Sequence, residues 1–207
     1  MRNTAVLLGV AVLAQGCLVT AVLPPESHRV PGEELEGTWS CRDASDKEWV
    51  STITTRPDGW SIYQSSNVEW EQELLADGNQ DWTPHVEVGD PWKFALYKFD
   101  KLHYLIGAPD APSCDCMVDG YMIAAAEVKG SKATILTANE ETLKAGVQSG
   151  DVDVLVSENN VWLLKYDAEE LAAFLSQPKT HKLLGDKKEG KMTCVQIAGR
   201  YAPARED

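Results

Sequence analysis

The chain has 207 residues, of which 43% are hydrophobic and 25% are charged, and this is the composition of an ordinary globular domain. A chain of this size can bury enough apolar surface to fold without a metal ion or disulfide bonds. Its formal net charge of −13 at pH 7 repels nucleic acids and anionic lipids, so neither is expected as a partner.

The first segment of the chain has the pattern of an export signal. Arg2 precedes an uncharged apolar run over residues 4–23, and within that run the small residue Gly16 is followed by Cys17. A cysteine directly after small residues resembles the lipobox of bacterial lipoproteins. In that family the peptide is cut before the cysteine, which then carries the lipid. The resemblance implies a signal peptide over residues 1–16 and a lipid on Cys17.

Two other interpretations of this segment remain open. Residues 14–16 (Ala-Gln-Gly) also fit ordinary secretory cleavage, which would release a soluble protein. Residues 4–23 are also long enough to remain as a membrane-spanning helix. All three interpretations export the rest of the chain. In the lipoprotein interpretation, Leu18 after the cysteine implies the outer membrane, with the domain facing the periplasm or the exterior.

A single β-rich domain is expected over residues 37–200. Residues 17–36 contain three prolines and are expected to be a tether, and residues 201–207 are expected to be a frayed tail. Alternating or β-branched segments, separated by turn residues, predict strands. These strands are at 37–42, 49–55, 60–65, 92–98, 102–107, 121–128, 133–137, 161–166 and 192–197, while 69–75 fits a strand or a short helix.

Two short helices are expected near the C-terminal end. Asn139 can cap a helix that ends at Gly150, and Asp167 with Glu170 forms a capping-box pattern before a helix that reaches residue 175. The basic stretch 179–191 is expected to be mobile. Many hairpins followed by two helices and a strand predict an α+β, β-rich fold, which is an antiparallel sheet or a partly open β-barrel.

Two further resemblances concern the fold. Gly37-Thr38-Trp39 is similar to the opening of lipocalin-like barrels, where the Trp closes one end of the barrel. Residues 133–175, and above all 169–175 (EELAAFL), resemble a broad set of uncharacterised β-rich bacterial proteins, many of them lipoproteins. That set has no assigned catalytic residues, so the resemblance implies a fold and no catalytic site.

The remaining cysteines predict disulfide bonds in an oxidising compartment. If Cys17 carries lipid, Cys41, Cys114, Cys116 and Cys194 are left as candidates. Cys41 lies in the first predicted strand of the domain and Cys194 in the last, and the terminal strands of barrels are often neighbours. One interpretation pairs these two and leaves Cys114 with Cys116. The alternative links the loop containing Cys114 and Cys116 to each terminal strand.

The sequence contains no glycine-rich phosphate loop and no G-x-S-x-G, H-E-x-x-H or C-x-x-C motif. We therefore expect a protein that is not an enzyme and has no catalytic residue, metal or cofactor. It is expected to be anchored to the membrane through lipid, and either to bind a small apolar ligand or an envelope protein or to support envelope structure. Two alternatives are a metal-binding or redox protein that uses Cys114 and Cys116, with Met117, Met122 and His103 nearby, and a hydrolase with a cleft in the barrel.

Overall fold

A computed structural model describes residues 17–74, 80–110, 120–138, 140–158, 161–185 and 190–198. The expected signal peptide (1–16), Cys114, Cys116 and the expected frayed tail (201–207) lie outside the described residues.

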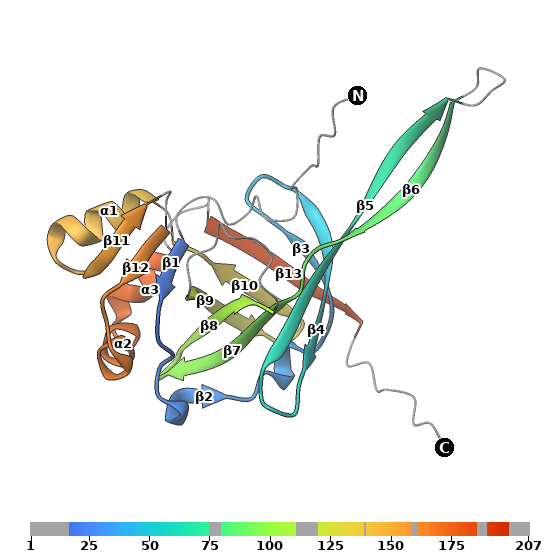
Figure 1. The fold of residues 1–207 in the computed structure, drawn as a ribbon. Helices are drawn as coiled ribbons and strands as arrows, with labels where there is room; N and C mark the ends of the chain where they lie inside the picture. Colours follow the sequence, from blue (N-terminus) through green and yellow to red (C-terminus); the bar gives the residue numbers. More distant parts are fainter. Residues whose placement is uncertain are drawn as a thin grey trace.

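Eight antiparallel strands form a closed barrel (Figure 1). They follow the order β3-β4-β5-β7-β8-β9-β10-β13, and β13 pairs back with β3 to close the ring. The strands are β3 (Gly37–Arg42), β4 (Glu48–Thr55), β5 (Ser61–Leu74), β7 (Trp92–Phe99), β8 (Leu102–Pro109), β9 (Tyr121–Lys129), β10 (Lys132–Leu136) and β13 (Lys191–Ala198). The predicted β-rich antiparallel fold is confirmed.

A disulfide bond joins the first and last barrel strands at the point where the barrel closes. Cys41 on β3 and Cys194 on β13 are direct cross-strand partners with Cα atoms 4.0 Å apart. Their sulfur atoms form the bond that one interpretation of the cysteines predicted. Such a disulfide indicates an oxidising, extracytoplasmic setting.

A two-stranded arm extends from the barrel on the side opposite the helices (Figure 1). It consists of the far part of β5 and of β6 (Gln80–Val88), which pair with each other along their length. The sequence did not predict β6, because Pro84 interrupts its pattern. Proline is tolerated here because β6 pairs with β5 alone within the described residues, so one of its edges makes no ladder hydrogen bonds.

Residues 17–36, which were expected to be a tether, instead pack on the barrel. Strand β1 (Cys17–Thr20) lies between β9 and β12 (Val161–Leu164), antiparallel to β9 and parallel to β12. Leu18 is 1% exposed, and apolar side chains of this kind favour burial over a solvated tether. The rest of the segment forms η2 (Glu26–His28), β2 (Arg29–Val30), which pairs with β7, and η3 (Glu33–Leu35).

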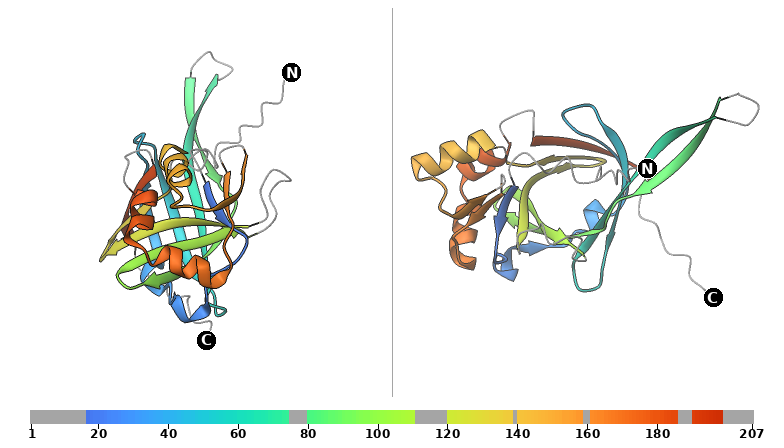
Figure 2. Two further views of the ribbon diagram at one scale, coloured as in Figure 1. Left: turned by 90° about the vertical axis from the view of Figure 1, so that its left-hand side faces the viewer. Right: turned by 45° about the horizontal axis from the view of Figure 1, so that its top comes forward.

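Three helices and the β11–β12 hairpin form a layer on one side of the barrel, which faces the viewer in the left view of Figure 2. The helices are α1 (Glu140–Ser149), α2 (Ala168–Leu175) and α3 (Pro178–Gly185), and β11 (Val154–Glu158) pairs with β12. The predicted capping box of α2 is present, because Asp167 and Glu170 exchange hydrogen bonds between side chain and backbone.

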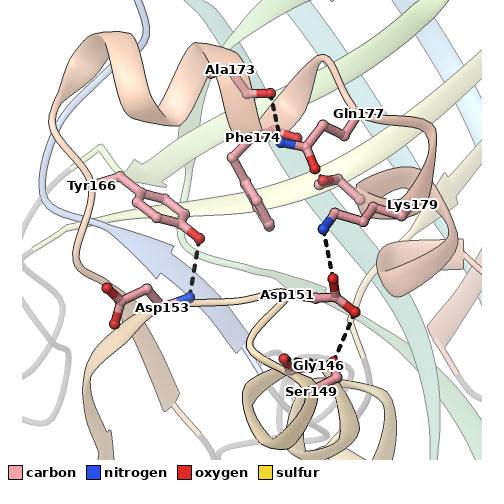
Figure 3. Close-up of polar contacts among 10 residues, drawn as sticks. Gly146, Ser149, Asp151, Asp153, Tyr166, Ala173, Phe174, Gln177 and Lys179 are labelled. Atoms are coloured by element: carbon pink, nitrogen blue, oxygen red, sulfur yellow. Dashed lines mark hydrogen bonds and ion pairs between the residues drawn. The ribbon is translucent and has the colours of Figure 1, made fainter.

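The third helix, α3, was expected to be part of a mobile basic stretch. Leu184 is buried on its inner side, and Pro178 begins it at a position that needs no backbone N–H. Polar contacts join α3 to the rest of the layer (Figure 3). The ammonium of Lys179 lies 2.6 Å from the Asp151 carboxylate, which also accepts a hydrogen bond from the Ser149 hydroxyl. These contacts and the apolar inner face explain why the segment is helical.

Two hydrophobic cores result from this arrangement. One lies inside the barrel and includes Leu35, Trp39, Ile53, Phe94 and Leu96. The other lies between the outside of the barrel and the helical layer, and it includes Tyr97, Tyr104, Ile106, Leu171 and Phe174. Strand β7 contributes to both cores with alternate residues, which is why it is buried almost continuously.

Candidate functional site: a cavity inside the barrel

The barrel interior contains a cavity of about 400 Å³ that opens to the surface. This volume lies within the range of small-molecule sites, which are concave and mostly apolar. Residues from all the barrel strands line it, and most of them are apolar. The apolar lining residues include Leu35, Trp39, Trp49, Ile53, Trp92, Phe94, Leu105, Met122, Ala124, Ala126, Val128, Ala133, Ile135 and Met192.

The cavity owes its room to small side chains on β9. Because side chains alternate across a strand, Met122, Ala124, Ala126 and Val128 face the interior while Ile123 and Ala125 face the outer core. Two successive inward positions are therefore alanines. Larger residues at these two positions would fill the space, as side chains do in small barrels without a ligand cavity.

Leu35 and Trp39 fill the interior beside the start of β3. The indole N–H of Trp39 donates to the backbone carbonyl of Leu35 at 2.8 Å, and the Trp39 side chain is 1% exposed. This hydrogen bond satisfies the indole in an apolar setting and fixes η3 against the barrel. The Gly-x-Trp segment therefore places its tryptophan in the barrel interior.

Polar groups of the cavity lie mainly on the β4–β5 wall. Tyr63 accepts two hydrogen bonds at its hydroxyl oxygen, from the Trp49 indole N–H at 2.8 Å and from the Ser51 hydroxyl at 3.0 Å. Burial raises the pKa of Tyr63, against the smaller opposing effect of these two donors. The phenol therefore keeps its proton at neutral pH, and it donates to no acceptor among the described residues.

Charged groups lie at the rim of the cavity, which is formed by the β3–β4 connection and by the base of the two-stranded arm. Lys47 is half-buried there, while Glu87 and Asp90 are exposed. The other lining cation, Lys93, has its ammonium 5.8 Å from the ring centroid of Trp60, which packs against the outer core. No histidine lies on the described lining, which presents apolar walls, hydroxyl groups and a charged rim.

The disulfide candidates Cys41 and Cys194 form part of the cavity wall. Cys17, the expected lipid site, begins β1 in the outer layer, where burial raises the pKa of its thiol to about 11. Lipidation of Cys17 stays a prediction.

Cys114 and Cys116 lie outside the described residues, so the metal or redox hypothesis also stays a prediction. Within the described residues, no three His, Cys, Asp or Glu side chains are grouped as metal ligands would be.

No binding residue in the barrel was predicted from the sequence, and Trp49, Ser51 and Tyr63 are the polar group of the lining that sequence reasoning missed. The signal for Trp49 and Ser51 was present in β4, where 49, 51 and 53 alternate with exposed residues and so share the inner face. Tyr63 on β5 is the cross-strand partner of Ile53 and therefore faces the same side. None of the described helices is both long and apolar enough to cross a bilayer. Comparisons with models of protein families, with curated proteins and with solved structures give no match for this chain.

Proposed function

We propose that this protein binds a small apolar ligand in the barrel cavity, as a carrier or receptor and not as an enzyme. The observation that supports the proposal is a cavity of about 400 Å³ whose lining is mostly apolar and includes Leu35 and Trp39. A barrel that served only as a structural module gains no stability from such a space, because apolar walls that stay uncovered forgo the free energy of burial.

The test measures binding of the neutral fluorophore N-phenyl-1-naphthylamine, both by its own emission and by quenching of the tryptophans that line the cavity. The variant Ala124→Phe fills the cavity and is expected to weaken binding by at least about tenfold, because it removes the volume that the probe occupies. Ala173→Phe is the matched control, since Ala173 is exposed on α2.

Thermal denaturation of each variant checks that the barrel is folded. Unchanged probe affinity in Ala124→Phe, or a wild-type protein that does not bind the probe, contradicts a ligand-binding role for the cavity.

We further propose that lipid on Cys17 holds the protein in the cell envelope, at the outer membrane. The disulfide supports an extracytoplasmic setting, and the acidic surface has little attraction of its own for anionic lipids. The intact mass of protein purified from membranes is expected to match a chain that begins at Cys17 and carries a diacyl or triacyl group. Cys17→Ser is expected to abolish the adduct. An unmodified chain that begins elsewhere contradicts the anchor and leaves the ligand proposal standing.

A further inference from the structure

We infer that the ligand is a neutral, largely apolar molecule with a hydrogen-bond acceptor, and that the Tyr63 hydroxyl donates to this acceptor. The inference rests on the proposed function, because it assumes that the cavity is the binding site. To that proposed function it adds the chemical class of the ligand and one residue that recognises the ligand.

The hydrogen bonds around Tyr63 leave its proton for a ligand. A phenolic oxygen accepts through its lone pairs and donates one proton. Trp49 and Ser51 both donate to the oxygen, at 2.8 Å and 3.0 Å. They fix the position of the oxygen, so that it acts as a positioned donor on the cavity lining. A buried donor stabilises a partner that accepts from it more than a partner that does not.

The distribution of polar groups orients the ligand. Ser51, Tyr63 and Ser65 lie on β4 and β5, whereas the opposite side of the barrel, around β9, offers Met122 and the two alanines. The acceptor of the ligand therefore lies against the β4–β5 wall and its apolar body lies against β9. A hydrocarbon without an acceptor fits the same volume but leaves the Tyr63 proton without a partner.

The charges at the rim favour a neutral ligand over a carboxylate. Lys47 lies near the carboxylate of Asp43, which accepts the Lys47 backbone N–H at 3.0 Å and attracts its ammonium electrostatically. Glu87 and Asp90 add negative charge at the rim, and the Lys93 ammonium lies over Trp60. An anionic head group inside the barrel would lose its hydration without gaining an unbalanced cation, which is unfavourable. A ketone, ester or alcohol avoids this cost.

The experiment compares three ligands of one chain length as competitors of N-phenyl-1-naphthylamine at neutral pH. They are a long-chain methyl ketone, the hydrocarbon and the fatty acid. Wild-type protein is expected to bind the ketone about tenfold more tightly than the hydrocarbon, and also more tightly than the fatty acid. Tyr63→Phe removes only the hydroxyl and is expected to lower ketone affinity by about tenfold, while hydrocarbon affinity stays within about twofold.

Tyr97→Phe is the matched control, because it removes the same atom from a tyrosine that is buried in the outer core. It is expected to leave all three affinities unchanged. Equal ketone affinity in Tyr63→Phe and wild type overturns the role of Tyr63, and tighter binding of the fatty acid overturns the neutral class. In both cases the cavity proposal stands as long as wild-type protein binds the fluorophore and Ala124→Phe weakens that binding. Failure of the wild-type protein to bind the fluorophore overturns both.

Discussion

Tyr97 carries a polar group where the outer core provides no partner for it. Its side chain is 0% exposed, and its hydroxyl makes no hydrogen bond within the described residues. Burial raises the pKa of Tyr97 to about 12, the Glu26 carboxylate adds to this effect, and Arg29 opposes it. Tyr104 differs, because its hydroxyl donates to the Leu175 carbonyl at 2.9 Å and so joins β8 to α2.

The raised pKa of Tyr97 predicts a loss of stability in alkali. The folded protein keeps the Tyr97 hydroxyl proton at pH values where the unfolded chain, with a pKa near 10.0, releases it. The contribution of Tyr97 ionisation to the free energy of unfolding is therefore fully retained below pH 10 and is lost as the pH rises towards 12. Urea denaturation followed across this range is expected to show a falling midpoint.

Tyr97→Phe is expected to make that fall shallower and to change stability at neutral pH by less than about 1 kcal/mol, because no hydrogen bond is lost. A midpoint that is constant over the whole range, or equally steep in the variant, contradicts this prediction. Tyrosinate absorbance reports the ionisation directly.

At the scale of elements, β1 joins the barrel to the helical layer. It makes backbone pairs with barrel strand β9 on one side and with β12 on the other. Its side chain Leu18 packs in the outer core with Trp162 and Leu164. The N-terminal segment is therefore a structural part of the body, and an anchor on Cys17 would hold the body directly at the membrane.

This role of β1 predicts that Leu18→Ala destabilises the protein by about 2–4 kcal/mol, because it removes a buried leucine from a packed core. Leu155→Ala on β11 is the matched control, since Leu155 is 63% exposed, and it is expected to cost less than about 0.5 kcal/mol. Chemical denaturation measures both. A Leu18→Ala variant as stable as the control would restore the interpretation of residues 17–36 as a tether.

At the scale of the whole molecule, the disulfide closes the barrel between chain positions 153 residues apart. A cross-link over a loop of this length lowers the entropy of the unfolded chain by an amount equivalent to about 5 kcal/mol. The double variant Cys41→Ala/Cys194→Ala is expected to lose about 2–5 kcal/mol of unfolding free energy in urea. Cys17→Ser is the control for loss of a cysteine, and a double variant with an unchanged urea midpoint contradicts the prediction.

Much of the fold was predictable because local signals agreed with it. Alternation predicted the barrel strands, and the Asp167–Glu170 capping box predicted α2. The errors have physical causes in contacts between distant segments. Strand β6 contains Pro84, which an edge strand tolerates, and α3 has a basic sequence whose buried side only the folded layer reveals.

The cavity was predictable only in outline. The sequence predicts that inward residues alternate along each strand, but the free space depends on which residues meet across the closed barrel. Ala124 and Ala126 leave room because their short side chains do not reach the large residues, such as Trp49 and Ile53, that line the opposite wall. The hydrogen bonds of Tyr63 depend on the β4–β5 register, which places Ser51 and Tyr63 within reach of each other.

The parallel pairing of β1 with β12 has a consequence for the order in which the protein can be completed. A chain is made from its N-terminus, so residues 17–20 emerge long before residues 161–164, with which they pair. The barrel likewise waits for β13 before β3 gains its second neighbour. During synthesis β1 can pair with β9 once residues 121–122 exist, but its second neighbour is made only with residues 161–164, so the two edges of β1 are covered at different stages.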